Sequence, residues 1–271
     1  MSKISSVIGL LLALVVLFVG IFDFSSGRII TAFFNGQAFL VVLGGSLAAL
    51  LINYPLSHLR CLGSGFKKIL TAEPHDVIET IEQIEELSRI AHSKTLLALE
   101  KEIENIEDPF LQFAVSEALV FNDIEMLRAS LKNEIYSLQR RHSICQDVFN
   151  NLASYAPAFG MMGTVMGLIV MMTQQAGGEQ VIYGTEASKD MLGSLLQGMG
   201  LALVTTLYGV VFSNLLFQPV AGKLKSLTDA EVLKNEVIVQ GILQIRKNQP
   251  PMLVKEALMS FVNQVEKEAM A

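Results

Sequence analysis

Three threonine hydroxyls lie inside long apolar stretches of this 271-residue sequence, and they are its clearest candidates for ion chemistry. Thr164 occurs in "PAFGMMGTVMGLIVMM", which begins at Pro157, and Thr205 and Thr206 occur together in "LVTTLYG". A single threonine in an apolar helix often bonds only to its own backbone, so one alone would mean little. Three hydroxyls at one depth of antiparallel neighbours would offer oxygen ligands to a cation. We therefore interpret these threonines as a candidate ion pathway.

Ionisable side chains are missing from the same stretches. No Asp, Glu, Lys, Arg or His occurs between residues 157 and 178 or between residues 191 and 222. Ion routes through a membrane usually include such a side chain. If ions move along these segments, the carboxylate must therefore come from another chain.

The composition is that of a membrane protein. Hydrophobic residues make up 51% of the chain, charged residues make up 17%, and the mean hydropathy is +0.47. A helix needs about 20 apolar residues to cross the bilayer core. Four stretches without charged residues reach that length, namely residues 4–22, 34–53, 152–173 and 193–218. The sequence predicts an all-α integral membrane protein with four transmembrane helices.

The polar parts of the chain define the remaining domains. Apolar residues at helical spacing, from Val77 to Ile106 and from Ile124 to Leu138, predict amphipathic helices, and the second should continue into the third span. The expected division is a transmembrane hairpin at 1–53, a helical cytoplasmic domain at 54–151, a second hairpin at 152–218 and a cytoplasmic tail at 219–271.

The positions of lysine and arginine predict the orientation. The two short loops expected outside contain only Arg28 and Lys189, whereas the ends assigned to the inside carry Lys3, Arg60, Lys67, Lys68, Lys223 and Lys225. Because positive residues concentrate on the cytoplasmic side, both termini and the large middle domain are expected in the cytoplasm. Cys61 and Cys145 then lie in a reducing compartment, where no disulfide is expected.

Motifs for catalysis or cofactor binding are absent from the sequence. The stretch "GSGFKK" at Gly63 lacks the spacing of a phosphate-binding loop, and the four histidines have no metal-ligand spacing. The net charge of -6 argues against a nucleic-acid surface. We expect no catalytic residue, no metal centre, no cofactor and no nucleic-acid partner.

Glycines form a stripe along the third span. Gly160, Gly163 and Gly167 follow the i, i+3, i+7 pattern of one helix face, with Thr164 at its edge. Small residues let helix backbones approach closely in lipid, so we assign these glycines to helix packing.

A charged segment in the cytoplasmic domain has two interpretations. Charges on a helix usually form its solvated face, and Glu102 and Glu104 fit that interpretation. A short linker at "AHSKT" would instead place His92, Lys94 and Glu100 near a tip, where loops often carry function. The residues alone leave both interpretations open.

Four segments resemble the MotA/PomA family of flagellar motor stator subunits, and the resemblance covers nearly the whole chain. The segments are "YAPAFGMMGTVMGLI", "LVTTLYGVVFSNLLFQPVAGKL", "NGQAFLVVLGGSLAALLINYPL" and "LLALEKEIENIEDPF". The resemblance implies a ring of several copies in the bacterial inner membrane, around a dimer of MotB or PomB whose membrane helix brings the essential aspartate. It also implies that ion flow past this aspartate drives the ring, and that the cytoplasmic loop pushes on the rotor protein FliG.

The resemblance also assigns roles to particular residues. Pro157 and Pro219 match the family prolines at the start of the third span and the end of the fourth, where proline can make a hinge. Glu100 keeps the acidic position of the rotor contact. His92 stands where relatives usually carry arginine, and because histidine is largely neutral at pH 7, the contact should be weaker or shifted toward Lys94.

The same pattern predicts the transported cation. Sodium-driven, PomA-like members show "GT" and "TT" where many proton-driven members have alanine or glycine, and this chain has Thr164 after Gly163, and Thr205 before Thr206. The sequence thus predicts a sodium-driven stator. Alternatives are a proton-driven stator of the same family and an ExbB/TolQ-like energiser, although the latter resembles a three-span protein. A self-contained transporter would need charged residues within its spans, and a scaffold would not explain the threonines.

Overall fold

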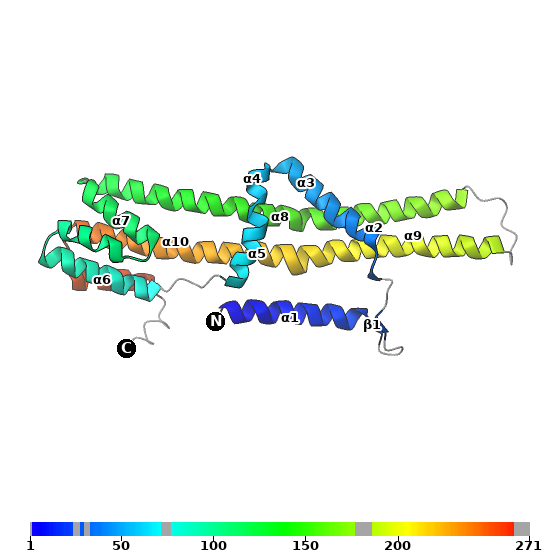
Figure 1. Ribbon diagram of the computed structural model, residues 1–271, viewed down its shortest axis with the longest axis horizontal. Coiled ribbons are helices and arrows are strands. Elements are labelled where there is room, and N and C mark those ends of the chain that lie inside the picture. Colours follow the sequence, from blue (N-terminus) through cyan, green and yellow to red (C-terminus); the bar gives the residue numbers. More distant parts are fainter. Residues whose placement is uncertain (1, 24–27, 30–32, 72–76, 177–185, 263–271) are drawn as a thin grey trace. The chain divides into compact units, whose positions relative to one another are not determined.

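The computed structural model describes residues 2–23, 28–29, 33–71, 77–176 and 186–262. Within these ranges the ordered elements are helices apart from one short antiparallel pair of strands, β1 (Phe22–Asp23) and β2 (Arg28–Ile29) (Figure 1). Apart from this pair, the prediction of an all-α protein is confirmed. The chain divides into two compact units, which are described separately: residues 1–72 with 144–224, and residues 73–143 with 225–271.

The first unit begins with a series of apolar helices. Its elements up to residue 71 are α1 (Ser2–Ile21), α2 (Gly36–Phe39), η2 (Leu40–Gly44), α3 (Gly45–Asn53), α4 (Leu56–Leu59) and α5 (Cys61–Thr71). The Asn35 side chain accepts hydrogen bonds from the N–H groups of Gln37 and Ala38 and so caps α2. Tyr54 is extended, because the following Pro55 disfavours helical backbone, and α3 ends there.

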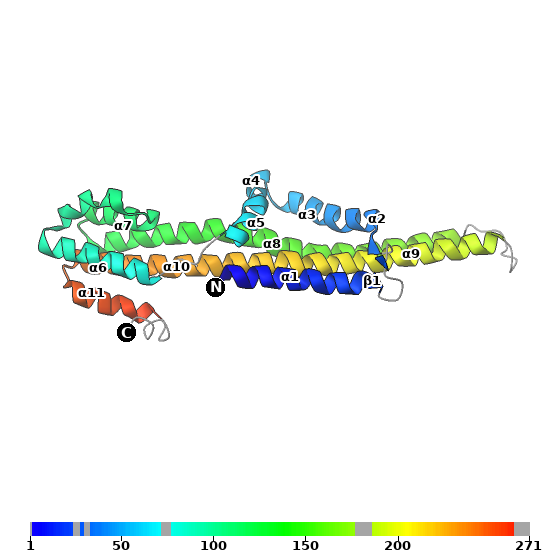
Figure 2. The same ribbon diagram turned by 60° about the horizontal axis from the view of Figure 1, so that its bottom comes forward.

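Two long helical runs complete the first unit and continue into the second. The runs are α8 (Ile124–Ala176) and the unbroken series α9 (Glu186–Val211), η5 (Phe212–Phe217) and α10 (Gln218–Arg246). Helix α8 is continuous from Ile124 to Ala176, which confirms the prediction that the amphipathic helix from Ile124 continues into residues 152–173, the expected third span. The C-terminal half of α8 lies alongside α9 in both views (Figures 1 and 2).

Three helical stretches of the described chain are long and apolar enough to cross a membrane: Gly36–Asn53, Ile124–Thr173 and Gly198–Arg246. The described part of α1 contains a shorter apolar helix, Leu11–Ile21. Large apolar side chains on these helices are exposed in the single chain, as at Val16, Leu40, Ile52 and Met172. Such a surface is suited to contact lipid or other subunits.

The largest fully buried side chain in the core of the first unit is Phe149 of α8. The other buried members of this core are Val42, Leu50, Val148, Leu152, Ala156, Phe217, Val220, Ala221 and Leu224. Gly65 of α5 packs directly on Phe149, because a Cβ at this glycine would lie 2.7 Å from the aromatic ring. The second glycine of "GSGFKK", Gly65, thus serves helix packing.

The second unit is a helical bundle. It contains α6 (Val77–Ser93), η3 (Leu96–Lys101), η4 (Ile103–Asn105), α7 (Pro109–Val120), parts of α8 and α10, α11 (Pro251–Leu258) and η6 (Met259–Phe261). Its core joins Ile81 and Ile84 of α6 to Leu111 of α7, Leu131 of α8 and Ile242 of α10. Residues 225–262, expected within a C-terminal tail, therefore fold together with residues 77–143 of the expected middle domain.

One predicted amphipathic helix takes a different form. The segment from Leu96 to Ile106 forms the 3-10 turns η3 and η4. Four of its apolar residues form two pairs with members three positions apart, Leu96 with Leu99 and Ile103 with Ile106. This spacing matches the three residues per turn of a 3-10 helix, which usually forms in short pieces.

Candidate functional site

The helices α8 and α9 meet along a seam of small residues. A Cβ on Gly160 would lie 3.0 Å from the carbonyl oxygen of Thr205, and one on Gly167 would lie 2.8 Å from the carbonyl oxygen of Gly198. A Cβ on Gly163 would lie 2.6 Å from the Thr205 hydroxyl oxygen. A Cβ at any of these positions would crowd α9, namely the Thr205 side chain at Gly163 and the α9 backbone at Gly160 and Gly167, so the two helices are in close contact.

The seam extends to the first proline. A Cβ on Gly209 of α9 would lie 2.6 Å from the carbonyl oxygen of Ala156 and 3.1 Å from Cα of Pro157. Pro157 lies within α8 without ending it. Pro219 is the second residue of α10, which begins at Gln218 directly after the π-helical turn η5. Both prolines are therefore inside helical runs of the first unit.

The three threonine hydroxyls lie near this seam and bond to their own helices. Thr164 donates to the carbonyl oxygen of Met161 at 2.6 Å, while Thr205 and Thr206 donate to that of Ala202 at 2.9 and 3.4 Å. Each hydroxyl hydrogen is bonded within its own helix, so the lone pairs of the hydroxyl oxygen remain available to coordinate a cation.

Burial separates the three threonines into two groups. Thr205 is 0% exposed and contacts Gly163, the neighbour of Thr164 in the sequence. Thr164 and Thr206 are only partly buried. In the single chain, Thr205 therefore packs within the seam, whereas the other two retain surface that a partner or an ion can reach.

The charged residues near "AHSKT" form an exposed tip of the second unit. Helix α6 ends at Ser93, and His92, Lys94 and Glu100 are all exposed on either side of the short connection to η3. His92 Nδ1 lies 3.3 Å from Asn248 Oδ1. The structure thus has the short linker that the tip interpretation requires. Sequence reasoning missed Leu97, an apolar side chain that is 70% exposed within this segment.

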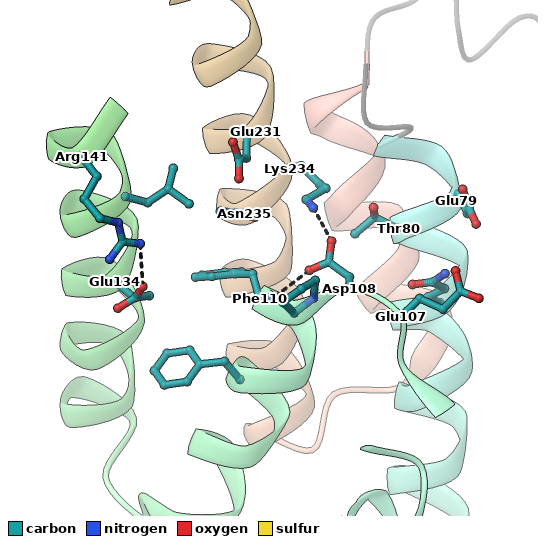
Figure 3. A pocket seen from close by; sticks show the side chains of 14 residues that line it. Glu79, Thr80, Glu107, Asp108, Phe110, Glu134, Arg141, Glu231, Lys234 and Asn235 are labelled. Carbon is teal, nitrogen blue, oxygen red and sulfur yellow. Dashed lines mark hydrogen bonds and ion pairs between the residues drawn. The ribbon is translucent and has the colours of Figure 1, made fainter. Parts of the chain in front are cut away.

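A groove in the second unit surrounds a partly buried ion pair (Figure 3). The carboxylate of Asp108 accepts hydrogen bonds from the N–H groups of Phe110 and Leu111, which caps α7, and it also pairs with the Lys234 ammonium of α10. Burial alone raises the pKa of Asp108, but the bonds from Lys234 and the α7 backbone outweigh it and hold this pKa below its usual value.

The role of this ion pair is structural. The Asp108 carboxylate bonds the backbone of α7 and pairs with Lys234, whose side chain is only 7% exposed, so the pair ties α10 to the start of α7. A second ion pair, between Glu134 and Arg141, joins two residues of α8 at 3.3 Å across the groove's edge (Figure 3). Across the described residues, no group of His, Cys, Asp and Glu could hold a metal ion.

The fold and the seam define a helical membrane protein in which two apolar helical stretches pack through glycine and carry threonine hydroxyls. Residues 102–237 match the model of the MotA/TolQ/ExbB proton channel family, and the chain belongs to this family. It is 31% identical to Motility protein A of Treponema phagedenis, over 88% of this chain and 86% of the relative. It is also 31% identical to Chemotaxis protein PomA of Vibrio alginolyticus, over 88% of each chain.

A solved structure agrees with this assignment. The flagellar MotAB stator complex from Bacillus subtilis contains a chain that superimposes with a TM-score of 0.82 at 27% identity, over 98% of both chains. The resemblance to the MotA/PomA proteins is confirmed. The prediction of a multi-pass membrane protein is confirmed as well. Because the family consists of channel proteins, the expectation that the chain is not an enzyme is confirmed too.

Proposed function

We propose that this chain is the ion-conducting stator subunit of a bacterial flagellar motor, which couples cation flow to torque on the rotor. The observation that carries the proposal is the α8–α9 seam, which presents hydroxyl oxygens beside two helix backbones in contact. The seam supplies hydroxyl ligands but no carboxylate, so a complete ion path needs a carboxylate from another chain. The relatives named Motility protein A and PomA, and the MotAB stator structure, support the flagellar assignment.

The missing carboxylate comes from a partner. We assign this role to the membrane aspartate of a MotB- or PomB-like protein, because residues 157–178 and 191–222 contain no ionisable side chain. Several copies of this chain form a ring around that partner, and the exposed apolar side chains of the first unit provide the surface for it. The similar solved structure is a complex of MotA and MotB, which supports an assembly of two kinds of subunit.

The topology follows the distribution of positive charge. Helix α1 is the first of four spans, and the two hairpins occupy residues 1–53 and 152–218 of the inner membrane. Residues 54–151 and 219–271 lie in the cytoplasm with both termini, because lysine and arginine flank the ends assigned there.

Sodium is the proposed cation. Na⁺ must replace its hydration shell with oxygen ligands, which the partner carboxylate and threonine hydroxyls can supply, whereas a proton needs only the carboxylate. Thr164 and Thr206 retain accessible surface, and the buried Thr205 reaches the ion only where the seam rearranges around the partner helix. Thr164 and Thr205 are the ligands that discriminate sodium, and Thr206 serves either ion.

The rotor contact is the exposed tip of the second unit. Lys94 and Glu100 present opposite charges to FliG, and His92 extends the same surface. Pro157 and Pro219 are the hinges through which the ring changes shape, because a proline removes one helical hydrogen bond.

A complementation experiment tests the proposal. This chain and its cognate MotB/PomB-like partner are expressed as the sole stators of a flagellated strain, and the torque of tethered cells is measured. Wild-type protein should restore rotation, and replacing the partner's membrane aspartate with asparagine should abolish it without lowering abundance. Rotation that persists with the asparagine variant contradicts the proposal.

A proton-driven stator of the same family is the second candidate. It is favoured by the bonding of all three threonines, since each hydroxyl donates to its own helix as in an ordinary structural threonine. An ExbB/TolQ-like energiser fits less well, because the fold superimposes on a flagellar stator subunit over 98% of its length.

A further inference from the structure

The carbonyl oxygen of Ala153 has no backbone partner four residues ahead, because that position is Pro157. An α-helix normally uses the N–H at position i+4 to satisfy this oxygen, and proline has none. An unpaired carbonyl in a packed helix costs free energy comparable to a lost hydrogen bond. The hydroxyl of Ser213 supplies the bond instead: Ser213 Oγ donates to Ala153 O at 2.6 Å.

The glycine seam brings Ser213 to this position. Gly209, four residues before Ser213, contacts Ala156 and Pro157. Residues four apart lie on the same helix face, so the close approach at Gly209 also directs Ser213 at α8. Ser213 is 6% exposed, so water competes little for its hydroxyl.

Ser213 also belongs to the irregular turn before the second proline. Its backbone carbonyl accepts the N–H of Gln218, five residues ahead, which is the π-helical bond closing η5. Gln218 directly precedes Pro219, so this N–H is the last backbone donor before the second proline. Helices often accommodate a proline or a functional site through such a turn. One residue thus bonds at both irregularities, with its side chain at Pro157 and its carbonyl next to Pro219.

We propose that Ser213 is a positioning residue that couples the two prolines into a single hinge. Bending α8 at Pro157 changes the distance between Ala153 and η5, so it must strain or release the Ser213 bond. Movement at one proline is thereby transmitted to the turn that precedes the other. The use of this hinge in torque generation rests on the proposed stator function, but the coupling itself concerns the fold.

A double-mutant cycle tests the coupling. The pair Ser213→Thr and Ser213→Val has nearly the same shape and differs in the hydroxyl, so their difference in melting temperature isolates the hydrogen bond. The pair is made with Pro157 intact and with Pro157→Ala, which restores the N–H that Ala153 O lacks. Thermal unfolding is measured on the full chain purified with its partner.

With Pro157 present, the Val variant should melt about 2–4 °C below the Thr variant, as expected for loss of one buried bond in a domain of this size. With Pro157→Ala, at least half of that difference should disappear, because the backbone now satisfies Ala153 O. Ser46→Ala is the matched control, since this buried hydroxyl donates to Val42 O of its own helical run. Its effect should be the same in both backgrounds.

An equal Thr–Val difference in both backgrounds overturns the proposal and makes Ser213 a packing residue. If Pro157→Ala does not accumulate, the Thr–Val pair alone decides: equal melting temperatures overturn it, and a lower one for Val supports it. Motor torque is measured in parallel with protein abundance. If wild-type protein supports no rotation, the stator function fails, while the unfolding cycle still decides whether Ser213 couples the prolines.

Discussion

Gly163 of α8 and Thr205 of α9 are in direct contact: a Cβ on Gly163 would lie 2.6 Å from the Thr205 β-carbon, methyl carbon and hydroxyl oxygen. Thr205 is fully buried. The residue beside Gly163 in the sequence is Thr164, so the contact brings two of the three candidate ion ligands to one level of the seam. The size of the side chain at position 163 therefore matters both for helix packing and for the ion pathway.

Substitution of this glycine should separate the helices. Gly163→Ala is expected to destabilise the protein by about 1–3 kcal/mol, because the added methyl group overfills a packed contact. Gly200→Ala on α9 is the control, since a Cβ there meets nothing within 4 Å. Thermal unfolding of the purified complex measures both. Equal melting temperatures for the two variants would contradict the close packing of α8 against α9 at Gly163.

The sequence could predict this seam only in part. The i, i+3, i+7 spacing of Gly160, Gly163 and Gly167 reveals one small face, but it does not identify the residues opposite. Those are set by the register between α8 and α9, which depends on the whole packed interface. For the same reason, the bond from Ser213 to Ala153, 60 residues apart, has no sequence signature.

Other features were predictable to different degrees. The linker after α6 was one of two interpretations that the sequence left open, and it became certain only from the structure, where α6 ends at Ser93 and η3 begins at Leu96. The pairing of Asp108 with Lys234 spans 126 residues and required the tertiary structure. The 3-10 form of residues 96–105 was missed because apolar pairs three apart fit an α-helix nearly as well.

Removing the charge of Asp108 should weaken the second unit. Asp108→Asn keeps an oxygen that can cap α7 but leaves the Lys234 ammonium buried without a counter-charge, which should cost roughly 3 kcal/mol. Asp123→Asn is the control, because Asp123 caps the exposed start of α8 through Glu125 N–H. Urea unfolding should separate the two variants, and equal midpoints would show that the ion pair contributes nothing.

Acid should have the same effect as this substitution. The folded-state pKa of Asp108 is lowered, so the unfolded chain binds the proton more readily than the folded chain. The stabilisation is therefore complete above the ordinary carboxyl pKa of about 3.9 and is lost as the pH falls below it through the lower folded value. Wild-type protein should lose more stability than Asp108→Asn between pH 5 and pH 3, in unfolding experiments at about those values. Parallel losses would contradict the assignment.

Charge reversal at the tip should reduce torque without preventing assembly. Lys94→Glu or Glu100→Lys places a like charge against the rotor, whereas Glu104→Lys changes an exposed charge assigned to the solvated face. Torque is measured in tethered cells alongside membrane abundance and ion conduction. Rescue by an opposite charge on the rotor would support a direct contact. Normal rotation of both tip variants would show that the tip is only a solvated surface.

Cysteine labelling tests the orientation. In a chain with Cys61→Ala and Cys145→Ala, cysteines introduced at Ser25 and at Gly184 should react with a membrane-impermeant reagent in intact cells. A cysteine at Glu104 should react only after the cells are opened, because the middle domain is proposed to be cytoplasmic. Labelling at Glu104 in intact cells would refute this orientation.

Removing one hydroxyl should weaken sodium binding selectively. Thr164→Ala loses an oxygen ligand worth about 1 kcal/mol, which corresponds to a roughly fivefold higher sodium concentration for half-maximal speed. Thr173→Ala is the control, because Thr173 is exposed near the end of α8 and donates only to Ile169 and Val170. An equal shift in both variants would point to a general loss of function.

Motor speed as a function of external sodium, at a fixed proton-motive force, tests the central claim most directly. Cells that carry this chain and its partner as their only stators are tethered, and rotation is followed as sodium replaces potassium at constant ionic strength and pH. A sodium-driven stator with hydroxyl ligands predicts saturable speed that vanishes without sodium and survives collapse of the proton gradient while the sodium gradient is maintained. Rotation that persists without sodium and stops only when the proton gradient is removed would contradict sodium coupling and identify a proton-driven stator whose threonines serve packing alone.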